Sequence, residues 1–170
     1  MNIKIEKAVI LDNIRSVYNV GSIFRTADAV GVNHIYLIGQ TPTPVDRFGR
    51  ERKDLAKVSL GAEKNIPWTY FKNEESLAQL QKMKKRGVVL VAVEQDEKSV
   101  DYREVVVTQP KNNPQKTISK TALIFGNEVD GVSSEILKIS DYIAEIPMKG
   151  KKESLNVSVS AGIVMYELFC

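Results

Sequence analysis

Apolar residues recur along this chain in two alternating patterns. Short, nearly continuous apolar runs are typical of buried strands. Between them, apolar residues return every three or four positions, which predicts amphipathic helices. The predicted strands are Ala8–Leu11, His34–Ile38, Trp68–Phe71, Val88–Val93, Ala122–Phe125 and Tyr142–Ile146. The predicted helices are Val20–Val30, Arg52–Ala62, Asn73–Gly87, Ser133–Ile139 and Leu155–Phe169. This alternation predicts an α/β fold with a mainly parallel sheet and helices on both faces.

Local signals mark several of the element ends. Gly31 and Gly87 are predicted helix stops, and Asn73 is a predicted helix cap. The run Val88–Val93 is continuously apolar, as in a central strand of a parallel sheet. The segment Thr108–Lys120 is polar and contains two prolines, so we interpret it as an insert between two strands.

The composition fits one domain. The chain has 170 residues, of which 43% are hydrophobic, and this is enough for one buried core but too little for two ordinary domains. No internal repeat or linker divides it, so we expect a single domain over residues 1–170. The first residues lack a secretory signal, and no segment approaches the roughly 20 apolar residues of a membrane span. We therefore expect a soluble, cytoplasmic protein.

Cysteine and histidine are scarce. The only cysteine is Cys170, and the only histidine, His34, opens an apolar strand and is expected to be structural. A metal site, a disulfide framework and a histidine-based triad are therefore not expected. Any catalysis has to use Asn, Arg, Glu and Ser side chains, which favours positioning and charge over a base that titrates near neutral pH.

The net charge of +3 is modest and does not by itself indicate a nucleic-acid binder, but the basic residues are clustered. One cluster lies in the predicted loop and helix around residue 50, one at the end of a predicted helix, and one in the loop before the last helix. Their members are Arg47, Arg50, Arg52, Lys53 and Lys57; Lys82, Lys84, Lys85 and Arg86; and Lys149, Lys151 and Lys152. Each is either a solvated surface or a contact for a polyanion.

Polar residues follow the first predicted strand and enter a helix. Asn19 and Gly21 stand at the start of that helix, where the small residue allows close backbone approach. Arg25 offers a fixed cation with several donors suited to phosphate. The alternative is an ordinary helix cap with a surface arginine.

A second polar segment follows the strand Ala122–Phe125. Gly126, Asn127 and Glu128 come directly after this strand, where ligands bind in open α/β sheets. For Glu128 the alternative is a solvated turn acid. Neither a dinucleotide fingerprint nor a phosphate-binding P-loop occurs in the chain.

The third polar segment precedes the last helix. After the strand Tyr142–Ile146, the chain passes a short basic loop and reaches a helix whose first turns are predicted to contain Ser154 to Ser158. This helix is apolar or small on nearly every face, which indicates burial on more than one side. We predict that a second copy of the chain covers it; the alternative is a fully buried internal helix.

Together the three segments resemble the three motifs of the SpoU-like branch of the SPOUT methyltransferases. The matching residues are Asn19-x-Gly21-x-x-x-Arg25, Phe125-Gly126-Asn127-Glu128-x-x-Gly131, and Ile146-Pro147-Met148 with Ser154-Leu155-Asn156-Val157-Ser158. The resemblance covers almost the whole chain. It implies a deep trefoil knot near the C-terminus, a homodimer formed through the C-terminal helix, and methyl transfer from S-adenosylmethionine to a ribose 2′-hydroxyl of tRNA or rRNA.

The resemblance also implies roles for individual residues. The methyl donor would lie in a cup of loops formed by Val93, Gly126, Asn127, Ile146, Met148 and Leu155. The acceptor nucleotide would be held by Asn19, Arg25, Glu128, Ser154 and Asn156. In this family the arginine at the position of Arg25 is often cast as the base that takes the 2′-hydroxyl proton. A guanidinium rarely gives up its proton, so we interpret Arg25 instead as an anchor for the adjacent phosphate that also stabilises the developing alkoxide.

Two other functions remain open at this point. One is a catalytically silent RNA-binding module of the same fold. The other is a small-molecule nucleotide-binding protein, which would need a phosphate loop that the sequence lacks. The target RNA and nucleotide are not indicated. Larger members of the family carry an added RNA-binding domain, whereas the resemblance here implies a single methyltransferase domain over residues 1–170 with no separate RNA-binding domain. Recognition would therefore depend on the dimer surface and on the basic clusters at Arg47–Lys57 and Lys82–Arg86.

Overall fold

The computed structural model describes residues 7–105 and 120–170. In this part of the chain, seven strands form one sheet in which every neighbouring pair is parallel. The strand order is β3-β2-β1-β6-β4-β7-β5. The strands are β1 (Lys7–Asp12), β2 (His34–Ile38), β3 (Trp68–Phe71), β4 (Val89–Val93), β5 (Val100–Asp101), β6 (Thr121–Phe125) and β7 (Tyr142–Glu145).

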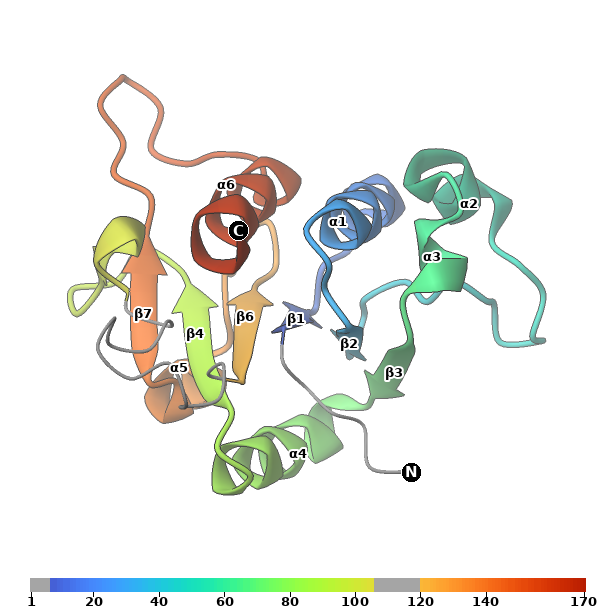
Figure 1. Cartoon of the computed structure of the whole chain (residues 1–170), viewed down its shortest axis with the longest axis horizontal. Coiled ribbons are helices and arrows are strands. Elements are labelled where there is room, and N and C mark those ends of the chain that lie inside the picture. The colour runs from blue at the N-terminus through green and yellow to red at the C-terminus, as the bar shows by residue number, and fades with distance from the viewer. Residues whose placement is uncertain (1–6, 106–119) are drawn as a thin grey trace.

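Helices cover both faces of the sheet, as predicted. Figure 1 shows α1 and α6 side by side on one face, with α2 and α3 beyond α1, and α4 and α5 on the other face. Their bounds are α1 (Val17–Ala29), α2 (Lys53–Ser59), α3 (Ala62–Asn65), α4 (Asn73–Lys85), α5 (Ser134–Ile139) and α6 (Val157–Phe169), with a single 3₁₀ turn at Tyr102–Glu104.

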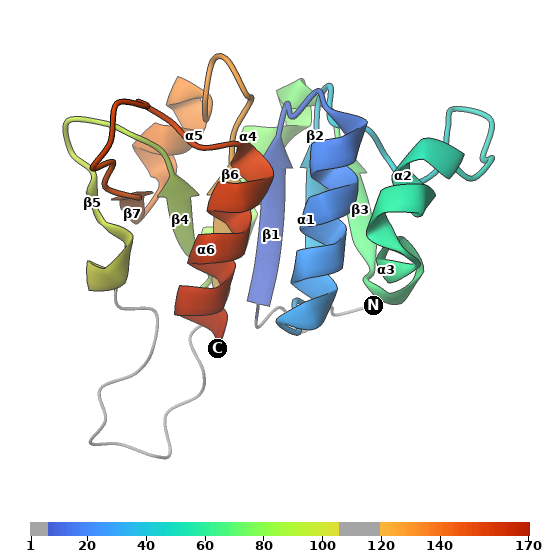
Figure 2. The same ribbon diagram turned by 90° about the horizontal axis from the view of Figure 1, so that it is seen from above.

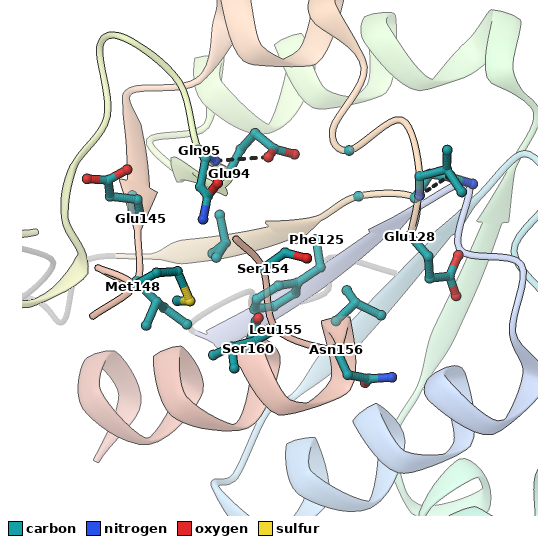
Figure 3. A pocket seen from close by; sticks show the side chains of 18 residues that line it. Glu94, Gln95, Phe125, Glu128, Glu145, Met148, Ser154, Leu155, Asn156 and Ser160 are labelled. Carbon is teal, nitrogen blue, oxygen red and sulfur yellow. Dashed lines mark hydrogen bonds between the residues drawn. The ribbon is translucent and has the colours of Figure 1, made fainter. Parts of the chain in front are cut away.

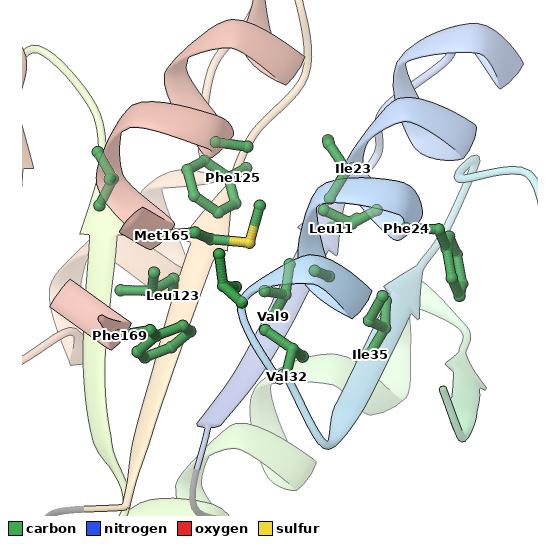
Figure 4. Close-up of a cluster of buried hydrophobic side chains, with 14 of the residues drawn as sticks. Val9, Leu11, Ile23, Phe24, Val32, Ile35, Leu123, Phe125, Met165 and Phe169 are labelled. Carbon is green, nitrogen blue, oxygen red and sulfur yellow. The ribbon is translucent and has the colours of Figure 1, made fainter. Parts of the chain in front are cut away.

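The sheet separates two hydrophobic clusters because successive side chains of a strand point to opposite faces. On β1, Val9 and Leu11 belong to the cluster beneath α1 and α6, whereas Ala8 and Ile10 belong to the cluster beneath α4 and α5. Figure 4 shows the first cluster, where Met165 of α6 meets the sheet. Both faces of the central strands are therefore buried, which explains their continuous apolar sequence.

The parallel arrangement puts the carboxyl ends of all the strands at one edge of the sheet (Figure 2). The loops that follow β1, β4, β6 and β7 meet at this edge. Three of these four strands carry the polar segments singled out in the sequence, and the fourth, β4, lies between β6 and β7.

Most predicted elements occur at or near their predicted bounds, but three details were wrong. The helix predicted at Arg52–Ala62 is shorter and is α2 alone, because Leu60 takes a left-handed conformation (φ 52°) that ends it; α3 begins only at Ala62. The predicted cap Asn73 is the first residue of α4; the cap is Lys72, whose backbone N–H donates to Glu75 Oε2. The last helix begins at Val157 rather than Leu155.

Three short elements, α3, β5 and the 3₁₀ turn, were not predicted, because two to four residues carry no periodicity. Except for Lys120, the insert predicted at Thr108–Lys120 lies outside the described residues. The knot implied by the resemblance stays a prediction.

Candidate active site

A pocket of about 320 Å³ lies at the carboxyl edge of the sheet, between the ends of β4, β6 and β7 and the start of α6 (Figure 3). Its volume is within the usual range for small-molecule sites, roughly 300–1,000 Å³. All six residues predicted to hold the cofactor line it: Val93, Gly126, Asn127, Ile146, Met148 and Leu155. Glu128, Ser154 and Asn156 line it as well. The structure thus brings together segments more than sixty residues apart, while the individual roles remain predictions.

The loop after β6 forms one wall of this pocket and is folded back tightly on itself. Asn127 and Gly131 exchange backbone hydrogen bonds of 2.9 and 3.0 Å. A Cβ on Gly126 would collide with the backbone of Gly131 and Val132, so only glycine fits there. The wall therefore depends on a close backbone approach.

The side chain of Asn127 organises the same loop from within. Its Oδ1 accepts hydrogen bonds from the backbone N–H groups of Val129 (2.8 Å) and Asp130 (3.1 Å). Its Nδ2 donates to the backbone oxygen of Asn13 (2.7 Å), which joins the loop to the segment after β1. Asn127 is buried, so these bonds make it a structural residue of the pocket wall.

Two acidic residues that the sequence reasoning missed tie the far end of this loop to the sheet. Asp12 Oδ2 accepts the backbone N–H of Ser133 (2.8 Å), and Glu94 Oε2 accepts the backbone N–H of Val132 (2.9 Å). Asp12 is buried at the end of β1, and Glu94 directly follows β4. The sequence does contain a signal for Asp12 and Glu94, because each is an acid at the carboxyl end of an apolar strand. We used this signal only for Glu128.

A chain of hydrogen bonds joins the three polar segments. Asn19 Nδ2 donates to Glu128 Oε1 (2.9 Å), and Asn156 Nδ2 donates to Asn19 Oδ1 (3.2 Å). Asn156 is the cap of α6, and its Oδ1 accepts the backbone N–H of Ser158 (2.8 Å). Because a carboxylate only accepts, Glu128 fixes the orientation of the Asn19 amide and, through it, that of Asn156.

Glu128 also anchors the entrance to α1. Its carboxylate accepts the backbone N–H groups of Arg15 (3.0 Å) and Ser16 (3.1 Å) just before the helix, where the helix dipole favours an anion. Burial alone would raise the pKa of Glu128. The hydrogen bonds from Arg15, Asn19 and Ser16 outweigh burial and hold this pKa below its usual value. Glu128 is therefore a stable anion and a weak base.

Arg25 lies apart from this network. It follows Asn19 by six residues, so in an α-helix it lies about 9 Å further along the axis and on a different face of the helix. Its side chain is exposed, and it does not line the pocket. Asn19 does not line the pocket either, but its hydrogen bonds to Glu128 and Asn156 keep it beside the pocket. Of the residues predicted to hold the acceptor, Arg25 is therefore the one that a single chain leaves outside the site.

The sole histidine has a structural environment. His34 is buried, its Nε2 is 2.9 Å from Thr69 Oγ1, and its ring contacts that of Tyr36. Burial lowers its pKa. Within the described ranges, no group of three or more His, Cys, Asp or Glu side chains is placed to hold a metal ion. In the same ranges no helix is long and apolar enough to cross a membrane.

Comparison with known proteins gives consistent matches over nearly the whole chain. The sequence profile of the SpoU rRNA Methylase family matches residues 6–166. The tRNA (guanosine(18)-2′-O)-methyltransferase of Aquifex aeolicus is 36% identical over 160 residues, which are 94% of this chain and 66% of the relative. The putative TrmH family tRNA/rRNA methyltransferase YacO of Bacillus subtilis is 35% identical over 162 residues, which are 95% of this chain and 57% of the relative. The chain thus spans less than two thirds of either relative.

Solved structures agree. The crystal structure of the A. aeolicus TrmH/SpoU tRNA modifying enzyme has a TM-score of 0.78 and 33% identity, over 96% of this chain and 74% of that chain. The AdoMet-bound rRNA methyltransferase from Sinorhizobium meliloti has a TM-score of 0.81 and 28% identity, over 98% of this chain and 57% of that chain.

Proposed function

This chain belongs to the SpoU rRNA Methylase family, and from that premise we propose that it is an S-adenosylmethionine-dependent RNA methyltransferase. It would transfer a methyl group to a ribose 2′-hydroxyl of tRNA or rRNA in the cytoplasm. The observation that carries the proposal is the chain of hydrogen bonds from Glu128 through Asn19 to Asn156 at the mouth of the pocket. These hydrogen bonds fix polar groups from all three polar segments beside one small-molecule site.

The charge of the pocket suits the proposed methyl donor. Three carboxylates line it, from Glu94, Glu128 and Glu145, and no Lys, Arg or His is among the described residues that line it. S-adenosylmethionine carries a positively charged sulfonium, which such a pocket stabilises, whereas the phosphates of a nucleotide would be repelled. The lining therefore favours a methyl donor over the phosphate-bearing ligand of a small-molecule nucleotide-binding protein.

The apolar part of the lining suits an adenine ring. Phe125, Met148 and Leu155 line the pocket (Figure 3), and backbone groups at the ends of β4, β6 and β7 surround it. When bound, the donor supplies an electrophilic methyl group. The protein holds the donor and leaves the amide groups of Asn19 and Asn156 to orient the acceptor.

The reaction requires positioning more than proton chemistry. The bound donor would supply the methyl group and keep the electrons of the broken carbon–sulfur bond, and the ribose hydroxyl, oriented by Asn19 and Asn156, would release its proton to solvent. Glu128 is a poor base because its carboxylate already accepts three hydrogen bonds. The guanidinium of Arg25 rarely gives up its proton, so Arg25 acts as an anchor for the adjacent phosphate and stabilises the developing oxyanion.

A homodimer is the second part of the proposal. Val159 and Tyr166 of α6 and Tyr18 of α1 are 50%, 55% and 64% exposed, so the fully buried helix considered above is wrong. A second copy packed over α1 and α6 would cover these side chains. Because Arg25 lies outside the pocket of its own chain, we propose that it serves the pocket of the second copy.

The test of the reaction is methyl incorporation into unmodified bulk RNA with labelled S-adenosylmethionine, followed by nucleoside mass spectrometry. We expect a 2′-O-methylated nucleoside that disappears with Arg25→Ala. Arg25→Lys, which keeps the charge and loses the planar fork, should also be badly impaired. Donor binding without incorporation into any RNA pool would instead support the catalytically silent RNA-binding module.

Mixed dimers test the placement of Arg25. Arg25→Ala and Asn156→Ala chains are each expected to be inactive. If Arg25 acts on the pocket of the other copy, a mixed dimer has one site with both residues intact and recovers activity. No recovery in a verified mixed dimer, or a monomer in light scattering at micromolar concentration, would contradict the dimer proposal.

A further inference from the structure

The loop between β2 and α2 contains a self-contained hairpin at residues 45–51. Val45 and Glu51 form an antiparallel bridge, and the backbone N–H of Asp46 donates to the oxygen of Arg50 (2.8 Å). The carboxylate of Asp46 closes the turn by accepting the backbone N–H groups of Phe48 (2.8 Å) and Arg50 (3.0 Å). The turn of the hairpin is thus closed by its own residues, and its end is tied to α3 by an ion pair between Glu51 and Lys64 (2.7 Å).

This hairpin presents an aromatic ring between two cations. Phe48 is 66% exposed at the turn. The guanidinium carbon of Arg47 lies 4.7 Å from the centre of the ring, and that of Arg50 lies 5.0 Å from it. Asp46 holds the Arg50 side chain through a 2.8 Å bond to Nε, while Arg47 has no acidic partner among the described residues.

Such an arrangement matches the chemistry of an unpaired nucleotide. Bases stack on aromatic rings and on guanidinium planes, and a free arginine binds the adjoining phosphate. Bases within a duplex are already stacked and present no free face. We propose that the hairpin at residues 45–51 binds an unpaired base of the RNA substrate by stacking on Phe48, with Arg47 on the neighbouring phosphate. This inference rests on the proposed RNA methyltransferase function and deepens it.

The position of the hairpin supports this role. It follows β2 and so projects at the edge of the sheet where the pocket lies, on the far side of α1 (Figure 2). The second basic cluster, Lys82–Arg86, ends α4 and precedes β4, which puts it at the opposite edge. Of these two clusters, only the one around Phe48 lies at the edge of the sheet where the target nucleotide would enter the pocket.

A protein partner fits these residues less well. Phe48 is a lone apolar side chain among Arg47, Arg50 and Arg52, and a protein interface has a contiguous apolar centre. The hairpin is also preorganised, so little conformational entropy is lost when a base stacks on it.

Two fluorescently labelled RNAs test the proposal by anisotropy: a hairpin with an unpaired loop and a fully paired duplex of the same base composition. Phe48→Ala should weaken binding of the looped RNA by about 5- to 100-fold, as for loss of one stacked base, and leave duplex binding unchanged. Phe48→Trp should keep the affinity, and Phe48→Leu should lose it because an aliphatic side chain has no π face. Lys85→Ala is the matched control and should behave as wild type.

The salt dependence separates stacking from charge. For the looped RNA, Arg47→Gln should reduce the slope of log affinity against log salt by about 0.7, the contribution of one phosphate contact. Phe48→Ala should leave that slope unchanged. In the methylation assay, Phe48→Ala should raise KM with little change in kcat, because the ring lies away from the pocket.

Two outcomes would overturn the inference. One is a Phe48→Ala protein that binds looped RNA as tightly as wild type. The other is evidence that the ring is a packing or protein contact. That evidence would be either an equal loss of affinity for Phe48→Ala and Phe48→Trp or a change of oligomeric state in either variant. Wild-type protein that neither binds nor methylates RNA would contradict the proposed function itself, so the two failures are distinguishable.

Discussion

Two loops at the same edge of the sheet differ in how far the rest of the fold holds them. The hairpin at residues 45–51 is closed by Asp46, a member of the hairpin. The loop at residues 126–133 is tied down by Asp12 from β1, by the backbone of Asn13, and by Glu94 after β4. The first loop is the more autonomous of the two, because only the Glu51–Lys64 ion pair joins it to a helix. The second loop combines the internal bonds of Asn127 with these ties to other parts of the fold.

The difference fits the two proposed tasks. A cofactor pocket has to be held within fractions of an ångström, so its wall is fixed by several elements. A loop that stacks one base needs only a stable ring in the right place. A disruptive substitution in the pocket loop should therefore destabilise the whole domain, whereas one in the hairpin should affect only the hairpin.

The largest expected effect comes from a matched pair of glycine substitutions. Gly126→Ala forces a Cβ into the backbone of Gly131 and Val132, and we expect a loss of about 3 kcal/mol or more in unfolding free energy, with loss of S-adenosylmethionine binding. Gly49 has a φ of 76° and open space around it, so Gly49→Ala costs roughly 1–2 kcal/mol within the hairpin alone.

Chemical denaturation and isothermal titration with S-adenosylmethionine measure both variants. Gly49→Ala should keep wild-type donor affinity and lose affinity for looped RNA. Equal global destabilisation by the two substitutions would show that the hairpin is not autonomous.

An intermediate effect is expected for the acids that close the loops. Glu94→Ala leaves the Val132 N–H without its acceptor, and we expect a loss of about 1–3 kcal/mol in donor binding or stability. Glu94→Gln retains an acceptor oxygen and should recover most of it. If Glu94→Gln is as impaired as Glu94→Ala, the charge rather than the hydrogen bond is what matters.

Asp46→Ala is the counterpart in the hairpin. It removes the acceptor for the Phe48 and Arg50 N–H groups, so the ring loses its fixed position. Donor affinity and melting temperature should match wild type, and affinity for looped RNA should fall several-fold. A lower melting temperature would contradict the autonomy of the hairpin.

The smallest effect concerns pH. The pKa of Glu128 is held below its usual value of 4.5, so its contribution to stability is fully present above that pH and is lost as the pH falls through the lowered pKa. Melting temperature should therefore be insensitive to this group from neutral pH down to about 5 and should fall in stronger acid. Glu128→Gln should remove that part of the acid dependence. An unchanged acid profile in Glu128→Gln would show that the ionisation of Glu128 does not hold α1.

Much of the fold was predictable because its signals are local. Buried parallel strands such as β4 and β6 are continuously apolar whatever their neighbours are. The break at Leu60 was missed because a single left-handed residue leaves the apolar period intact. The cap at Lys72 was missed because the cap is made by the Glu75 side chain rather than by its own.

The candidate site likewise has features with local sequence signals and features without them. The sequence by itself determined the strands, the helices on both faces, and the polar segments at the strand ends, because these depend on periodicity and on residues adjacent in the chain. Only the tertiary structure decided that Asn19 meets Glu128 across 109 positions and Asn156 across 137, and that Asp12 and Glu94 hold the pocket wall. It also left Arg25 outside the pocket of its own chain. Strand order and helix rotation set these contacts, and they result from packing the whole domain at once.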